Sequence, residues 1–193
     1  MLTVQQAANL QHLAHSVLLS AVHGEFVEVG CYVGHTSSVI MSILDPQVQK
    51  RPFHVYDCFS HRLSEAMDVR KVFESNLTSL GLPLPHIHQG DVNQTLPAQL
   101  PTQIAFAHID LGVGGSVEHH SALMTHTLEA VYPRLQKGGV LVLMDYHIPG
   151  VTIDGIDVNP GVRLAVDTFF ADKPEVPITL YGGAYSHGYV RKL

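Results

Sequence analysis

The sequence predicts an α/β protein with a doubly wound, mostly parallel seven-stranded sheet that closes with a C-terminal antiparallel hairpin. Short apolar runs alternate with longer segments whose apolar residues recur at helical spacing. This alternation is typical of parallel strands joined by crossover helices. The last two apolar runs, 176–181 and 185–191, are separated only by a tight turn, so these two strands are expected to pair antiparallel.

Length and composition bound the kind of protein. The 193 residues suffice for one core, and no linker or repeat divides them, so we place a single domain over 1–193. A net charge of -6 with scattered basic residues argues against a nucleic-acid partner. No stretch approaches the roughly 20 apolar residues of a membrane span. Since the first twenty residues also lack Lys and Arg, we expect a cytoplasmic protein without a membrane partner.

The first half of the chain divides into elements with clear boundary signals. A capping box of Thr3 and Gln6 is expected to open the first helix, which ends before Gly24. Asp45-Pro46 and Gly81 stop the later helices. The expected elements are a strand at 26–29, a helix at 36–44, a strand at 53–57, a helix at 64–80, a strand at 86–89 and a helical piece around 93–100.

The second half continues the alternation. It is expected to add a strand at 104–110, a helix at 117–136, a strand at 140–145, a loop at 147–159 and a helix at 160–171 before the hairpin. Gly138-Gly139 is expected to turn the chain into the strand at 140–145, whose unbroken apolar run is typical of a central parallel strand. Right-handed crossovers bring the carboxyl ends of the parallel strands to one edge, where ligands bind in such folds.

The glycine-rich turn after the first strand is the most informative motif. Glu28 stands two positions before Gly30, Gly34 follows, and the small residues Thr36 and Ser37 open a helix. This layout lets the backbone approach a nucleotide-like ligand closely. The spacing lacks the third glycine of dinucleotide sites and the Gly-Lys-Ser/Thr of phosphate loops. An acid before the first glycine suits an ammonium group, which favours S-adenosylmethionine as the cofactor.

Further acids follow the second and third predicted strands. Asp57 ends the second strand, where a carboxylate can accept hydrogen bonds from both ribose hydroxyls. Gly90, Asp91 and Val92 follow the third strand, where a carboxylate and a backbone amide could bind an adenine edge. These residues therefore extend the candidate cofactor site along the sheet edge.

Asp110 and Asp145 end the fourth and fifth predicted strands. An aspartate at a strand end is also often the N-cap of the next helix, and for each acid taken alone that alternative stays open. Carboxylates that converge on one edge repel each other unless a ligand or metal compensates them. Together they favour a ligand-binding or metal-binding edge.

Ordered motifs along the chain resemble the macrocin O-methyltransferase family, which methylates sugar hydroxyls of macrolide-type natural products and has the class I methyltransferase fold. The resemblance covers about residues 25–170. The motifs are EVGCYVGHT at 28–36, VYDCF at 55–59, GDVNQTLP at 90–97, HID at 108–110, LEAVYPRL at 128–135, GG at 138–139, DY at 145–146 and PGVRLAVDTFF at 160–170.

The resemblance implies that the methyl donor is bound through Glu28, Gly30 and Asp57, with the segment 90–92 around the adenine. With the neighbouring residues of these motifs, the expected cofactor site comprises Glu28, Gly30, Tyr32, Gly34, Thr36, Ser37, Asp57, Cys58, Phe59, Gly90, Asp91, Val92 and Asp110.

The resemblance also implies a Mg²⁺ site, for which Asp110 and Asp145 are the candidate ligands. The chain departs from the family pattern here. Gly112 stands where the family has a second acid after Asp110, and Met144 stands where it has an acid before Asp145. Mg²⁺ often takes only one or two carboxylates plus waters, so the site stays possible but is weakened.

We interpret His147, which follows the fifth strand, as the general base, because an imidazole titrates near neutral pH. A solvated loop histidine is the alternative. The expected catalytic residues are thus His147, Asp110 and Asp145. Only one helix precedes the first strand to cover the cofactor, which predicts a homodimer.

Three functions remain open from the sequence. The first is O-methylation of a small-molecule hydroxyl. The second is a protein that binds S-adenosylmethionine without transferring methyl. The third, another nucleotide-binding enzyme such as a short oxidoreductase, is disfavoured by the missing third glycine and by the terminal hairpin.

Overall fold

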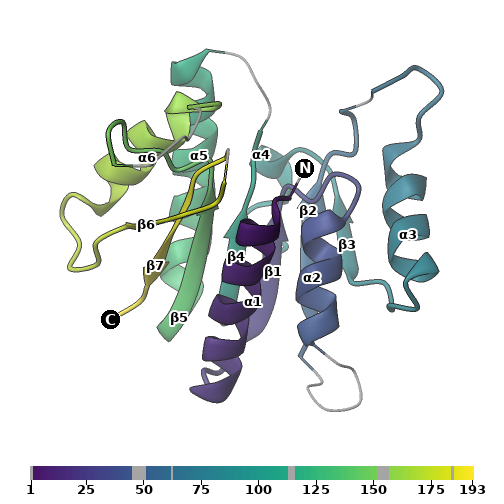
Figure 1. The fold of residues 1–193 in the computed structure, drawn as a ribbon, viewed down its shortest axis with the longest axis horizontal. Helices are drawn as coiled ribbons and strands as arrows, with labels where there is room; N and C mark the ends of the chain where they lie inside the picture. Colours follow the sequence, from purple (N-terminus) through teal and green to yellow (C-terminus); the bar gives the residue numbers. More distant parts are fainter. Residues whose placement is uncertain (1, 45–50, 62, 113–115, 152–156, 184) are drawn as a thin grey trace.

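The structure is a computed structural model that describes residues 2–44, 51–61, 63–112, 116–151, 157–183 and 185–193. These residues contain a seven-stranded sheet in the order β3-β2-β1-β4-β5-β7-β6 (Figure 1). The strands β1 to β5 pair in parallel, and β7 is antiparallel to both β5 and β6. The predicted fold class is confirmed. The strands are β1 (Glu25–Val29), β2 (Phe53–Asp57), β3 (His86–Gln89), β4 (Ile104–Ile109), β5 (Leu135–Met144), β6 (Ile178–Leu180) and β7 (His187–Arg191).

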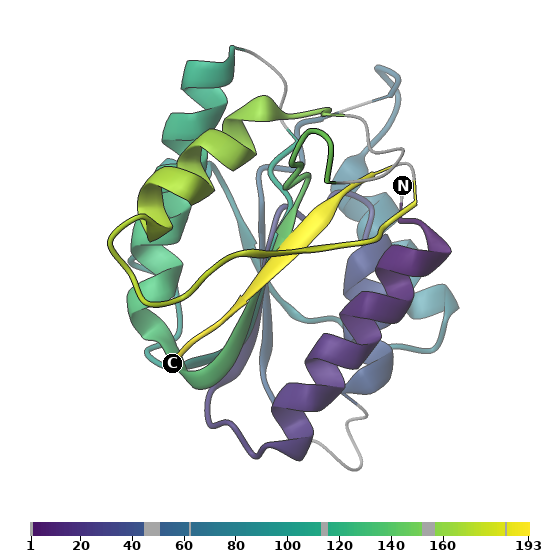
Figure 2. The same ribbon diagram turned by 60° about the vertical axis from the view of Figure 1, so that its left-hand side comes forward.

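Helices cover both faces of the sheet (Figures 1 and 2). One face carries α1 (Val4–Leu19), α2 (His35–Ile43) and α3 (Val69–Ser79), and the other carries α4 (Val92–Thr95), α5 (Val117–Val131) and α6 (Pro160–Phe170). Successive strand residues point to opposite faces. Phe26 and Phe106 therefore pack in the core under α1–α3, whereas Val27 and Ile109 pack in the core under α4–α6.

Three predicted helices are shorter than expected. The helical piece expected around 93–100 forms only α4, and the other two are shortened for local reasons. The capping box of α1 is confirmed. The helix expected from residue 64 begins only at Val69, because the Asp68 side chain accepts a hydrogen bond from the Lys71 amide and caps it there. The helix expected at 117–136 ends at Val131 and continues as the 3₁₀ turn η1 (Tyr132–Arg134). Pro133 lacks the amide that a further helical turn needs.

Strand β5 begins earlier than predicted. A register shift between Ile104 and Phe106 lets Leu135 pair with Ile104, so Gly138 and Gly139 lie within β5 instead of before it. The predicted helix end at Asp45-Pro46, the middle of the 147–159 loop and Ala184 of the terminal turn lie outside the described residues. No helix in the described ranges is both long and apolar enough to span a membrane.

Candidate active site

The glycine turn lies against the end of β4. The Gly30 amide donates to the Tyr56 carbonyl and the Asp110 amide donates to the Val29 carbonyl, both at 2.8 Å. Gly30 has φ +84°, and a Cβ atom there would lie 1.8 Å from the Asp110 carbonyl oxygen. Only glycine allows this conformation together with so close an approach. The turn and Asp110 are thereby held side by side.

Asp57 fixes the conformation of the same turn. Its Oδ2 accepts from the amides of Cys31 at 2.9 Å and Tyr32 at 2.8 Å, and its Oδ1 accepts from the Phe59 amide at 2.6 Å. Tyr32 and Phe59 have φ of 48° and 53°, positive backbone angles that residues other than glycine rarely adopt. Three charge-assisted hydrogen bonds stabilise these two strained residues and join the ends of β1 and β2.

A cavity of about 720 Å³ opens at the carboxyl ends of β1 to β4. It is lined by nine of the predicted cofactor residues: Gly30, Tyr32, Thr36, Asp57, Cys58, Gly90, Asp91, Val92 and Asp110. Among the other residues that line it, the sequence reasoning missed Leu2, His61, Asn93 and His119. Asn93 follows a predicted residue directly, so its position gave a usable signal. The others reach the cavity from separate segments, and no local pattern marks them.

Glu28 lies beneath the cavity and not in its wall. The side chain is 0% exposed, accepts a hydrogen bond from the Ser37 hydroxyl and has its Oε1 3.3 Å from Nδ1 of His108. Ser37 is likewise buried at the start of α2. The structure brings these two predicted residues to each other, where they join β1 to α2.

Gly34 and Phe59 also lie outside the cavity lining. Gly34 precedes α2 with φ +86°, and a Cβ there would lie 2.9 Å from the Phe73 ring. Phe59 is buried, with its ring centroid 5.6 Å from that of Phe73. Both residues therefore pack on α3 and shape the turn from behind.

Asp110 and Asp145 stand at neighbouring strand ends. Burial raises the pKa of Asp110 to about 6, with Asp145 and Glu28 adding to the rise and His108 opposing it. Asp145 has φ 59°, and its Oδ2 accepts a 2.7 Å hydrogen bond from Nδ2 of Asn159. Burial also raises the pKa of Asp145, and the hydrogen bond from Asn159 partly opposes this rise. Burial thus disfavours ionisation of both carboxyl groups, and Asp110, unlike Asp145, lines the large cavity.

The predicted Mg²⁺ site is not complete among the described residues. They contain no cluster of three or more His, Cys, Asp or Glu side chains arranged to hold a metal ion. Asp110 and Asp145 supply two carboxylates, and one oxygen of Asp145 already accepts from an amide. One of the four carboxylate oxygens is thus already engaged, and the donor set is weaker than the resemblance implies for a cation that prefers six oxygen ligands.

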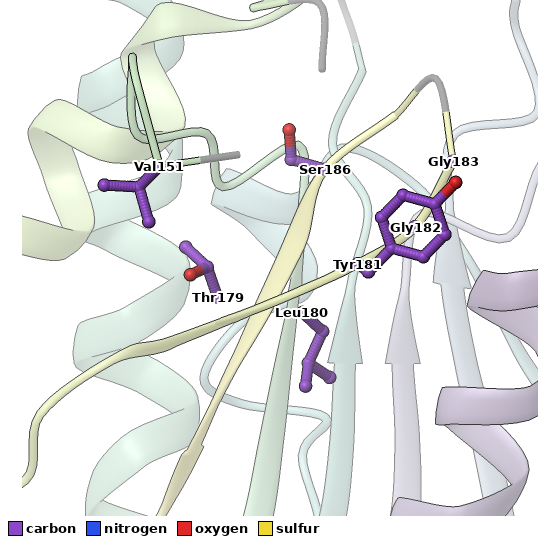
Figure 3. A pocket seen from close by; sticks show the side chains of 7 residues that line it. All are labelled: Val151, Thr179, Leu180, Tyr181, Gly182, Gly183 and Ser186. Atoms are coloured by element: carbon purple, nitrogen blue, oxygen red, sulfur yellow. The ribbon is translucent and has the colours of Figure 1, made fainter. Parts of the chain in front are cut away.

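His147 is placed away from the large cavity. It is buried, and its Nδ1 lies 2.8 Å from the Ser186 hydroxyl. Ser186 lines a separate cavity of about 140 Å³ between the β5–α6 loop and the β6–β7 turn (Figure 3), together with Val151, Thr179 and Tyr181. The geometry gives no support to His147 as the base beside Asp110.

Both cysteines are free thiols. Cys31 and Cys58 line the same cavity. Burial raises the pKa of the Cys31 thiol far above its usual range, with Glu28 and Asp57 adding to the rise. Because the thiolate is the reactive form, this shift makes Cys31 less reactive than an ordinary thiol.

The similarity of this chain to known proteins agrees with its fold and with the position of its large cavity. Residues 27–146 match the family model described as a methyltransferase domain. The chain therefore belongs to this methyltransferase family. No curated protein matches the chain.

Solved structures with similar folds include several methyltransferases. The O-methyltransferase NovP is 19% identical with a TM-score of 0.78, over 98% of this chain and 80% of that one. The calicheamicin methyltransferase CalS11 is also 19% identical, with a TM-score of 0.68 over the same shares. An O-methyltransferase from Bacillus cereus in complex with SAH is 16% identical, with a TM-score of 0.60 over 98% and 87%. At such identities the likeness shows the class I methyltransferase fold.

Proposed function

We propose that the protein is an S-adenosylmethionine-dependent O-methyltransferase that acts on a hydroxyl group of a small natural product or sugar. The observation that carries this proposal is the cavity of about 720 Å³, lined by both Asp57 and Asp110, in a chain of the methyltransferase family. NovP and the Bacillus cereus protein are both described as O-methyltransferases, which supports oxygen as the acceptor atom. The narrower macrocin resemblance stays a prediction.

The residues around the cavity suit this cofactor. Asp57 uses three acceptor sites for backbone amides, and a carboxylate offers about four, so one remains for a ribose hydroxyl. Asp91 is exposed at the cavity, where its carboxylate can accept from an adenine amine. Glu28 adds negative charge beneath the turn, which favours an ammonium group above it. When bound, the cofactor supplies an electrophilic methyl group.

Asp110 is the group in the cavity best suited to act as base. Transfer of a methyl group to a hydroxyl requires loss of the hydroxyl proton. The pKa of Asp110, raised by burial to about 6, leaves the carboxylate ionised at neutral pH yet able to take up a proton. In this proposal the acceptor hydroxyl lies beside Asp110, and its proton moves to the carboxylate as its oxygen gains the methyl group.

Binding of S-adenosylmethionine without methyl transfer is the second candidate function. It is favoured by the absence from this chain of two acids that belong to the macrocin O-methyltransferase pattern. A panel of hydroxylated and glycosylated natural products with isotope-labelled S-adenosylmethionine tests it. Tight cofactor binding with no methylated product from any acceptor would favour this second function. A homodimer and a cytoplasmic location stay predictions.

Replacing Asp57 tests the cofactor site directly. We expect Asp57→Ala to weaken binding of S-adenosylhomocysteine by about 1.5–3 kcal/mol, because the variant loses a charged acceptor and frees the turn amides. Isothermal titration calorimetry measures this loss. Asp68→Ala, which removes an exposed helix cap outside the cavity lining, serves as the control. An unchanged affinity in Asp57→Ala would remove Asp57 from the site.

Replacing Asp110 tests the assignment of the base. Once an acceptor is found, Asp110→Asn should lower kcat by about 10²–10⁴-fold, because an amide cannot take up the proton. His147→Gln should leave kcat nearly unchanged, since His147 contacts Ser186 outside the cavity. Single-turnover kinetics with cofactor affinity measured in parallel separates chemistry from binding. The reverse order of effects would restore His147 as the base.

A further inference from the structure

Of the two positions where the resemblance implies a further acid, one holds Met144 and the other holds Gly112. Gly112 leaves open space beside Asp110 in the wall of the large cavity. A Cβ atom built on Gly112 would lie 3.6 Å from Nδ2 of Asn159 and 3.9 Å from Oδ1 of Asp110. A carboxylate at position 112 would therefore extend into the space between these two side chains. The amide of Asn159 already lies next to that space.

The Asn159 side chain lies beside the acids and does not cap α6. It is the N-cap of α6, where an asparagine side chain normally accepts from the helix amides, yet it makes no capping hydrogen bond. Its Nδ2 instead donates to Oδ2 of Asp145 at 2.7 Å, and the residue is only 8% exposed. The side chain thus hydrogen-bonds to Asp145 instead of capping α6.

The surroundings of the acid pair show why a donor is needed. The negative charge of Asp145 makes ionisation of Asp110 less favourable. Asp157 has the same effect on Asp145. His120, on α5, interacts with the charge of Asp145 but has its Nε2 2.6 Å from the Leu111 carbonyl. Within the described ranges, the Asn159 amide donates a hydrogen bond directly to Asp145.

We propose that the Asn159 amide takes the place of the divalent cation at the Asp110–Asp145 pair, so that this site works without a metal. The inference rests on the proposed function and refines it. Asn159 is a positioning residue that acts through Asp145. The amide supplies a fixed N–H dipole where the macrocin family pattern implies a cation and more carboxylates. It holds the carboxylate of Asp145 at the strand end next to Asp110, and Asp110 lines the cavity.

Titration with Mn²⁺, followed by electron paramagnetic resonance, tests this proposal without an acceptor. The wild-type protein should show no saturable Mn²⁺ binding in the millimolar range. Asn159→Asp replaces the amide with a third carboxylate and should gain at least about tenfold in Mn²⁺ affinity. The reason is that the affinity of a site for a hard cation rises with the number of its carboxylate ligands. Gln11→Glu, on the exposed side of α1, adds the same charge elsewhere and should gain nothing. Adding Asp145→Asn to Asn159→Asp should abolish the gain.

Two results would overturn the proposal. The first is saturable Mn²⁺ binding by the wild-type protein that disappears in Asp145→Asn, and this measurement stands even where Asn159→Asp fails to fold. The second is a folded Asn159→Asp protein that binds Mn²⁺ no better than Gln11→Glu. Failure to bind S-adenosylhomocysteine in calorimetry would instead contradict the proposed function, and it is measured separately from Mn²⁺.

Discussion

Gly30→Ala is expected to lower the free energy of unfolding by more than about 4 kcal/mol or to prevent folding, an effect as large as single substitutions produce. The added methyl group would lie 1.8 Å from the Asp110 carbonyl oxygen, which is backbone and cannot swing away. The alanine would also have to hold φ +84°, which costs about 1–2 kcal/mol by itself. Relief requires β1 and β4 to separate where both are buried.

Gly81→Ala provides a matched control. Gly81 has φ +73°, but no atom lies within 4 Å of the position that an added methyl group would take, so only the backbone strain is added. This control should cost about 1–2 kcal/mol. Urea denaturation of both variants, followed by circular dichroism, separates strain from collision. Equal losses in the two variants would show that the Gly30–Asp110 approach does not govern stability.

The sequence predicts the glycine turn because its signals are local. An apolar run, an acid and two spaced glycines need no knowledge of the rest of the chain, and the turn lies where they place it. The role of Asp57 is only half visible in the same way. Its place at the end of β2 follows from the pattern, whereas its hydrogen bonds to Cys31 and Tyr32 depend on the pairing of β1 with β2.

His147 shows where local reasoning ends. The regular alternation of β5 stops at Asp145, whose left-handed φ of 59° redirects the chain. The next histidine consequently contacts Ser186 instead of the large cavity. Nothing in the sequence marks Asp145 for that conformation, so the direction of His147 could not be predicted.

Asn159 escapes sequence reasoning for a different reason. An asparagine before a proline at the start of a helical pattern indicates an N-cap, and the boundary itself is confirmed by α6. The contact that matters joins Asn159 to Asp145 across the β5–α6 loop. Tertiary contacts of this kind override a local capping preference, and a single sequence carries no signal for them.

His187 should make stability fall as the solution is acidified from about pH 6.5 to pH 4. The side chain is 1% exposed, and burial, aided by repulsion from His108, lowers its pKa from 6.5 to about 4. Between these values the unfolded chain binds a proton that the native protein excludes. A shift of this size is worth about 3 kcal/mol at 1.36 kcal/mol per pKa unit, present in full above pH 6.5 and lost by pH 4.

Asp110 acts in the opposite direction over nearly the same range, which decides how the experiment must be designed. Its pKa is raised from 3.8 to about 6, so the native protein binds a proton that the unfolded chain lacks, and acidification stabilises it. The two contributions largely cancel in the wild-type protein. His187→Gln should therefore gain stability relative to wild type, by about 3 kcal/mol, on going from pH 6.5 to pH 4. Asp110→Asn should lose stability steeply over the same range. Urea denaturation at each pH gives both differences, and a pH-independent difference between wild type and His187→Gln would show that His187 is not held neutral in the native protein.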